Sequence, residues 1–146
     1  MICTYEVTNP SSQNLCYSIG AHPGFKIPIK GSEKFEDYKL KFDPTKEYQI
    51  TILADGLLSE AKEELHLANG ELNLNTALFD KDALVFENSQ IDSISLISPS
   101  GNGVELNCND WPYFGIWSKK GCSEFVCLEP WYGITDNEHG SGDLKN

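Results

Sequence analysis

The sequence predicts an all-β domain with mostly antiparallel strands and little helix. Apolar and polar residues alternate in short runs, and these runs recur at a spacing of about ten residues. Gly, Pro, Asn and Asp separate the runs. Only two short segments have a composition that suits a helix or a helical turn. This combination is typical of a β-sandwich or a barrel-like fold.

Each of the first four predicted strands ends at a turn signal. They are residues 5–8 before Asn9-Pro10, 15–20 before His22-Pro23, 38–42 before Asp43-Pro44, and 47–53 before Asp55-Gly56. Six more strands are expected at residues 72–74, 83–86, 94–97, 104–106, 113–117 and 125–129. Residues 59–66 carry helix-forming side chains for one or two turns, and 76–80 predict a short turn. The polar residues after Ile134 are expected to be mobile.

Length and charge limit the possible functions. The chain has 146 residues, which suits a single domain spanning 1–146. Its net charge is −11 and every basic residue is a lysine. A polyanion partner needs a basic surface, so nucleic acids and anionic membranes are poor partners for this chain. Without arginine, the chain cannot bind phosphate or carboxylate through a guanidinium fork.

The termini and cysteines predict a cytoplasmic protein. The first six residues lack the basic and apolar regions of a signal peptide, and no apolar run reaches the length of a membrane span. The five cysteines are an odd number without C-x-x-C spacing. Cys16, Cys108 and Cys127 lie in apolar or alternating stretches, so we expect reduced and mostly buried thiols. No metal site is expected, because the three histidines are scattered and none is near a cysteine pair.

Two segments carry the candidate chemistry. In residues 18–25, strand alternation places Ser18, Gly20 and His22 on one face. In residues 125–134, Glu129 ends an apolar strand among aromatic neighbours. His22 and Glu129 each precede a proline, which holds the preceding residue in an extended conformation and interrupts the ladder. Both side chains are therefore expected at the rim of a strand.

This pair of residue types suits general acid–base catalysis. Burial beside aromatic surface raises the pKa of a carboxyl group towards neutrality, and a histidine can exchange a proton near neutral pH. Together they could move two protons on one small molecule. Trp111, Trp117 and Trp131 offer flat apolar surfaces, and Asp82 could accept hydrogen bonds from hydroxyl groups.

Each of these residues also has a purely structural interpretation. His22 could be a packed residue, Glu129 a strand-end cap, Asp82 a turn residue and Cys127 a small apolar filler. The tryptophans could belong to the core. A glycosidase that pairs Glu129 with Asp136 or Asp110 is another possible interpretation, and it would require a defined separation between the two carboxylates.

Four segments in order give a family resemblance over nearly the whole chain. They are residues 18–25, SIGAHPGF; 78–86, LFDKDALVF; 115–119, GIWSK; and 127–134, CLEPWYGI. Together they resemble the aldose 1-epimerase (galactose mutarotase-like) family. The resemblance implies a β-supersandwich that binds a sugar on a concave sheet.

The resemblance also implies roles for individual residues. Glu129 matches the family's base, which takes the proton of the anomeric hydroxyl, and His22 matches the acid, which protonates the ring oxygen. The ring then opens, turns about C1–C2 and recloses as the other anomer. Asp82 falls at the family's sugar-binding aspartate, and Trp117 and Trp131 would lie near the pocket. The implied substrate is an aldohexose such as glucose or galactose, and no cofactor is implied.

Family domains are longer than this chain, so the resemblance implies a partial β-supersandwich, the C-terminal half trimmed at both ends. Such a half is expected to have weak or no activity, since the missing N-terminal half brings sugar contacts. Its open strand edges predict self-association or pairing with that half. A monomer over a wide concentration range in the ultracentrifuge would contradict this. A non-catalytic carbohydrate-binding module and a structural domain are the alternatives.

Overall fold

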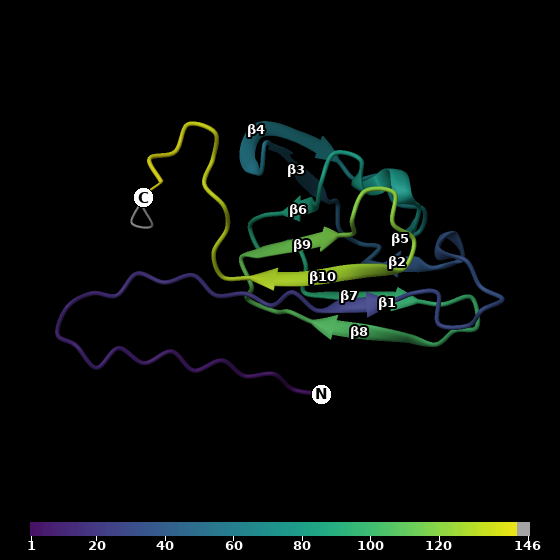
Figure 1. The fold of residues 1–146 in the computed structure, drawn as a ribbon, viewed down its shortest axis with the longest axis horizontal. Helices are drawn as coiled ribbons and strands as arrows, with labels where there is room; N and C mark the ends of the chain where they lie inside the picture. Colours follow the sequence, from purple (N-terminus) through teal and green to yellow (C-terminus); the bar gives the residue numbers. More distant parts are fainter. Residues whose placement is uncertain (143–146) are drawn as a thin grey trace.

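The computed structural model describes residues 1–142, and within them the fold is a two-sheet antiparallel β-sandwich (Figure 1). One sheet has six strands in the spatial order β1 (Gly24–Lys26), β10 (Phe125–Trp131), β9 (Tyr113–Trp117), β6 (Leu84–Phe86), β3 (Gln49–Ala54) and β4 (Leu57–Glu64). The other has four, β5 (Glu71–Asn73), β2 (Lys39–Lys41), β7 (Ser93–Ile97) and β8 (Gly103–Asn107). The helical elements described are two short 3-10 turns, η1 (Phe35–Asp37) and η2 (Thr76–Phe79). The predicted fold class is therefore confirmed.

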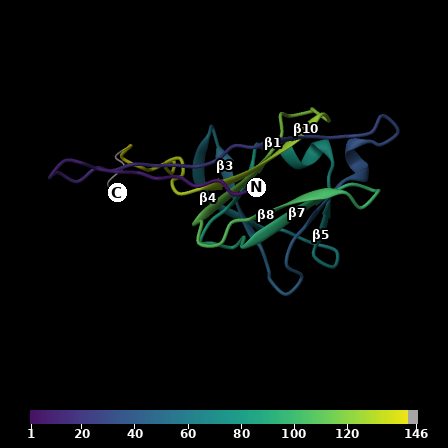
Figure 2. The same ribbon diagram turned by 90° about the horizontal axis from the view of Figure 1, so that it is seen from below.

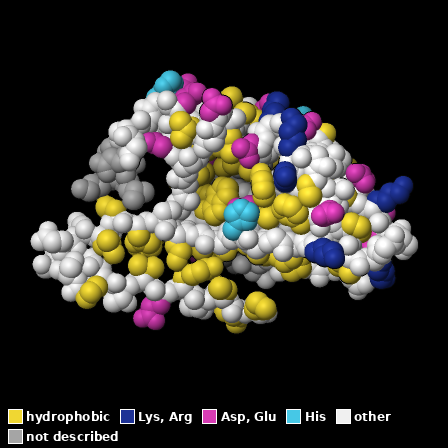
Figure 3. All heavy atoms as spheres, in the orientation of Figure 1, with side chains coloured by type: hydrophobic (Ala, Val, Ile, Leu, Met, Phe, Trp, Pro, Cys, Tyr) yellow, Lys and Arg dark blue, Asp and Glu magenta, His cyan; other side chains and the backbone are white. Residues whose placement is uncertain are grey.

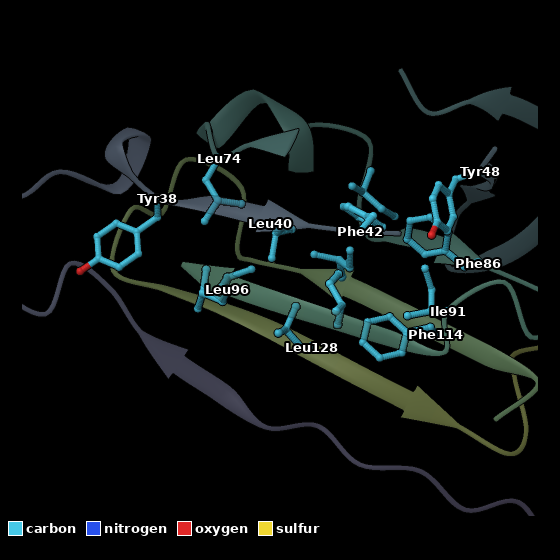
Figure 4. Packing of buried hydrophobic residues seen from close by; sticks show 14 of the residues in the cluster. Tyr38, Leu40, Phe42, Tyr48, Leu74, Phe86, Ile91, Leu96, Phe114 and Leu128 are labelled. Atoms are coloured by element: carbon cyan, nitrogen blue, oxygen red, sulfur yellow. The ribbon is translucent and has the colours of Figure 1, made fainter. Parts of the chain in front are cut away.

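The core lies between the two sheets (Figure 4). Alternate residues of each strand point inwards, as the pleat requires. Leu40 of β2 and Leu96 of β7 are directly paired, and both face Leu128 of β10 from the opposite sheet in the labelled view. Phe42, Tyr48 and Phe86 form an aromatic group with ring centroids 5.1–6.3 Å apart. The core packs against one face of β10. The other face of the six-stranded sheet is not covered by the second sheet.

Residues 59–64 belong to β4, and no helical turn forms in residues 59–66, in contrast to the expectation from composition. The Asp55-Gly56 pair explains the difference. Asp55 has a φ of 50° and Gly56 a φ of 81°, as a two-residue hairpin turn with the correct twist requires. The turn sends the chain back along β3, where Leu58 pairs with Leu53 and Glu63 with Ile50. Backbone pairing outweighs the weak helix propensity of this segment.

We predict that Gly56→Ala destabilises the fold by about 1 kcal/mol, because an L side chain is strained at this positive φ. A β-carbon at Gly56 would meet no atom within 4 Å, so the cost would come from the backbone alone. Gly31→Ala is the matched control, since its β-carbon would also meet open space and its φ is not positive. Urea unfolding of the two variants would measure the difference. Equal stabilities would contradict the assigned turn.

The two strands expected at residues 5–8 and 15–20 do not form. Residues 1–19 instead make an extended arm that leaves the sheets, as both views show (Figures 1 and 2). Its apolar side chains are exposed, including Tyr5, Val7, Leu15 and Tyr17. Cys16, which was expected to be buried, is also exposed. The alternation in this arm has no neighbouring strand in the described structure to pair with, apart from a single bridge between Gly20 and Trp131.

The polar segment after Ile134, expected to be mobile, lies against the β3–β4 hairpin. The Leu58 N–H donates to the Asp136 carbonyl and the Glu138 N–H donates to the Leu58 carbonyl, both at 2.9 Å. The Thr135 hydroxyl also donates to the Gly56 carbonyl. These bonds fix residues 135–138 at the side of the hairpin. Asp143, Leu144, Lys145 and Asn146, the trimmed C-terminal end in the family resemblance, lie outside the described residues.

Across residues 1–142 there is no helix with the length and apolar character needed to cross a membrane.

Candidate active site

His22 and Glu129 meet on the open face of the six-stranded sheet. β1 pairs with β10 in a register that aligns Gly24 with Cys127. Two residues before Gly24, His22 therefore comes alongside Glu129, two residues after Cys127 on the antiparallel strand. His22 Nε2 lies 3.2 Å from Glu129 Oε2. The two residues singled out by their positions before proline thus lie in direct contact, and their role as acid and base stays a prediction.

The environments of the two partners differ sharply. The Glu129 side chain is 4% exposed, whereas that of His22 is 61% exposed. Burial raises the pKa of Glu129 to about 7, although His22 and a hydrogen bond from the Trp131 side chain both act to lower it. A carboxyl group with this pKa can accept or release a proton near neutral pH, which is the property expected of a catalytic base.

A cavity of about 670 Å³ opens beside this pair. Figure 3 shows an apolar hollow on this face of the molecule, with a histidine side chain at its edge. Its walls come from six parts of the chain: the segment before β1, the β3–β4 hairpin, β6 with the residues just before it, β9, the end of β10 and the segment after β10. The lining residues are Ser18, Ile19, Gly20, His22, Leu53, Gly56, Asp82, Ala83, Val85, Trp117, Glu129, Trp131, Gly133, Ile134 and Thr135.

The tryptophans form the aromatic part of the wall. Trp117 packs edge-on against His22, with ring centroids 5.9 Å apart, and rests on Phe125. Trp131 lies across β9 over Gly115, the residue paired with Glu129. A side chain at Gly115 would overlap this indole ring. Gly115 therefore makes room for the ring that borders the buried carboxyl group.

Gly115→Ala is predicted to displace the Trp131 indole and to destabilise the fold by about 2 kcal/mol through overpacking. The tryptophan fluorescence spectrum should shift with the indole. Gly24→Ala is the control, since its β-carbon would lie at an ordinary 3.5 Å from Cys127 Sγ. Urea unfolding and fluorescence would follow both variants. An unchanged Gly115→Ala protein would show that the indole does not depend on this glycine.

Asp82 lies on the rim of the cavity, as expected of a residue that contacts a bound hydroxyl. It occupies a turn after η2 with a φ of 83°, a conformation that is strained for a residue other than glycine. Its carboxylate accepts a hydrogen bond from the Ala83 N–H and is exposed. Asp82 therefore lies in a turn at the cavity, and a contact between its carboxylate and a bound hydroxyl stays a prediction.

Sequence reasoning missed the contribution of the β3–β4 hairpin and of Thr135 in the segment after β10. Leu53, Gly56 and Thr135 line the cavity, but no local signal marks them. They meet the site because the Thr135 hydroxyl donates to the Gly56 carbonyl across 79 positions of sequence. By contrast, Trp111 packs between Tyr5 and Tyr132 rather than at the cavity.

The carboxylates considered for a glycosidase lie elsewhere. Among the described residues that line the cavity, Glu129 and Asp82 supply the carboxylates, and neither Asp110 nor Asp136 is present. The Asp136 carboxylate accepts hydrogen bonds from the N–H groups of Asn137 and Gly142. His66 and His139 are exposed, and neither is among the described residues that line the cavity.

A third donor atom adjoins the acid–base pair. His22, Cys127 and Glu129 each offer one potential metal-ligand atom, and these atoms lie within 4.8 Å of one another. The sequence alone did not indicate this group, because His22 lies about a hundred positions from the other two residues. The Cys127 thiol is buried, and burial together with the nearby Glu129 carboxylate raises its pKa to about 11.

Fold and site together define an antiparallel β-sandwich with a buried carboxyl group and an exposed imidazole at an apolar cavity. No family model matches the chain. The chromosomal LacX protein of Lactococcus lactis is 35% identical over 143 residues, covering 94% of this chain and 48% of that protein. A plasmid-encoded LacX protein gives the same values.

Two solved structures share the fold. A galactose mutarotase related enzyme from Lactobacillus acidophilus has a TM-score of 0.77 and 30% identity, covering 89% of this chain and 44% of that one. A galactose mutarotase-like protein from Lactobacillus casei has a TM-score of 0.76 and 26% identity, covering 89% and 46%. The chain spans about half the length of the relatives it matches. In sequence and fold it is similar to these galactose mutarotase-related proteins over about half of their length.

Proposed function

We propose that the chain carries the acid–base pair of an aldose 1-epimerase-like isomerase, which interconverts the α and β anomers of an aldose. The observation that carries this proposal is the convergence of the buried Glu129 carboxyl and the exposed His22 imidazole, 3.2 Å apart at the cavity. The similarity in sequence and fold to a galactose mutarotase related enzyme supports it.

The chemistry requires two proton transfers at neighbouring atoms. In a cyclic aldose, the ring oxygen and the anomeric hydroxyl are bonded to the same carbon. A base must take the hydroxyl proton while an acid protonates the ring oxygen, so the two groups must approach from adjacent positions. In our proposal Glu129 is the base and His22 the acid. Reclosure after rotation about C1–C2 reverses both transfers and leaves the protein unchanged, so no redox cofactor is required.

The remaining walls suit a monosaccharide. Trp117 and Trp131 offer apolar faces for the C–H groups of a sugar ring, and Asp82 offers a carboxylate to its hydroxyls. The aldohexoses glucose and galactose are the substrates we propose to test first. The cavity volume of about 670 Å³ lies within the general range of small-molecule pockets.

Polarimetry on freshly dissolved α-glucose and α-galactose tests the proposal. We expect the optical rotation to reach equilibrium faster than in buffer, at a rate proportional to protein concentration. Two preparations should be compared: this chain alone, and the chain mixed with the complementary half of a LacX-like relative. No acceleration in either preparation would reject the epimerase proposal.

A non-catalytic sugar-binding module is the second candidate. The observation that favours it is that the aromatic walls and Asp82 belong to this chain, while the chain spans about half the length of its relatives. Calorimetric titration with galactose would distinguish the two. Binding that persists in Glu129→Gln and His22→Ala, without any acceleration of mutarotation, would favour the module.

A further inference from the structure

We propose that His22, Cys127 and Glu129 form a binding site for a single zinc ion at the edge of the cavity. The three potential ligand atoms lie within 4.8 Å of one another, and they come from two hydrogen-bonded segments of one sheet. Cys127 and Glu129 are two positions apart on β10, so their side chains point to the same face. His22 approaches from the segment before β1.

The separations suit a tetrahedral ion after a small adjustment. Zinc binds nitrogen, oxygen and sulfur at about 2.0–2.3 Å, so two ligand atoms of one tetrahedral site lie roughly 3.3–3.7 Å apart. His22 Nε2 and Glu129 Oε2 are already 3.2 Å apart. The remaining separations are 4.8 Å or less. The His22 side chain is 61% exposed and contacts Trp117 edge-on, so a rotation of the imidazole towards the sulfur meets little of the core, while β10 carries the other two donors.

The donor set selects zinc over the hard divalent cations. Thiolate and imidazole are preferred ligands of Zn²⁺, whereas Mg²⁺ and Ca²⁺ require several oxygen ligands. An ionised Cys127 and Glu129 would supply two negative charges for the dication. Both are buried, where opposite charges attract more strongly than in water. The net charge of −11 also favours cations near the surface.

Access to the site comes from two sides. His22 and Glu129 line the main cavity, and His22 and Cys127 line a second hollow beside it. Gly24 pairs with Cys127 and has no side chain to cover the sulfur. Three protein donors leave a fourth position open towards the cavity, for water or another small ligand.

Zinc at this site would engage both members of the acid–base pair. If the proposed epimerase function holds, zinc and sugar therefore exclude one another, and zinc inhibits mutarotation. The binding site itself does not rest on that function, so its test uses binding alone.

Cobalt(II) is the probe, because a cysteine thiolate bound to Co²⁺ gives a charge-transfer absorption band. The test protein carries serine in place of the three more accessible cysteines, Cys3, Cys16 and Cys122. Titration of this protein with Co²⁺ should produce the band with one ion per chain, and Zn²⁺ should abolish it by displacement. Excess Mg²⁺ should leave it unchanged.

Two further substitutions in that background locate the site. Cys127→Ser should remove the band, and His22→Ala, at an exposed position that the fold tolerates, should weaken zinc binding at least about tenfold. Cys108→Ser, at the other buried cysteine, should leave both unchanged. Circular dichroism confirms the fold of each variant. A band that survives Cys127→Ser, or the absence of any band in the parent protein, would overturn the proposal.

Discussion

Replacing Glu129 with glutamine should reduce the rate of anomer interconversion by about 100-fold or more, the usual loss when a general base is removed. Glutamine has nearly the same shape as glutamate, and its carbonyl can still accept the hydrogen bond from Trp131. It cannot take a proton from the anomeric hydroxyl. The variant therefore removes the chemistry while leaving the cavity in place.

The control for this variant is Glu105→Gln. Glu105 is exposed on β8, in the opposite sheet, and its carboxylate is 3.4 Å from the Ser95 hydroxyl. Polarimetry on α-galactose should show an unchanged rate for Glu105→Gln and a near-background rate for Glu129→Gln. Equal rates in the two variants would show that Glu129 is not the base.

Most strands are predictable because their signals are local. Alternating residues mark β2, β3, β5, β7 and β8, short apolar runs mark β6, β9 and β10, and Asn, Pro or Gly marks the turns near many of their ends. β2, β7 and β8 alternate between more buried and exposed residues, so the period of two survives in their sequence, whereas β6 is buried throughout. Their order in space is a different matter. β6 lies between β3 and β9, and β1 pairs with β10, through pairings that no local pattern encodes.

The secondary-structure predictions that were wrong concern segments whose conformation depends on pairing between strands. Residues 59–66 read as helix-forming, yet the Asp55-Gly56 turn directs residues 59–64 into β4. Residues 5–8 and 15–20 alternate as strands do, yet they pair with nothing in the described chain beyond the Gly20 bridge. Alternation shows that a segment can form a strand, whereas a strand also needs a neighbour to satisfy its backbone.

The candidate site likewise combines local signals in the sequence with contacts that depend on strand pairing. The positions of His22 and Glu129 before proline are local signals, and the register between β1 and β10 then brings these residues within 3.2 Å. Asp82, Trp117 and Trp131 line the same cavity, and their roles towards a sugar stay predictions. The proximity of Cys127 to His22 depends on that register. For this reason the positions of the three histidines in the sequence did not indicate a group of metal-ligand atoms.

Glu129→Gln is also expected to stabilise the folded chain by about 3 kcal/mol above neutral pH, in contrast to its effect on the rate. Burial raises the pKa of Glu129 from 4.5 to about 7. Between these values the folded protein holds a proton that the unfolded chain has released. The free energy of unfolding therefore falls as the pH rises through this range, and above pH 7 the fold bears the full cost of a buried carboxylate. Neutral glutamine never carries that charge.

Urea unfolding of both proteins at about pH 5 and about pH 8 measures this effect. The stability advantage of Glu129→Gln should be small at the lower pH and reach about 3 kcal/mol at the higher one, since titrating groups that do not contact Glu129 contribute equally to both proteins. If the difference in stability between the two proteins does not change with pH, the pKa of Glu129 is not raised in the folded state. Burial would then not prepare this carboxyl group for proton transfer near neutral pH. Loss of activity together with a gain in stability above neutral pH is what a buried catalytic base predicts, because the same desolvation raises its pKa and destabilises the fold.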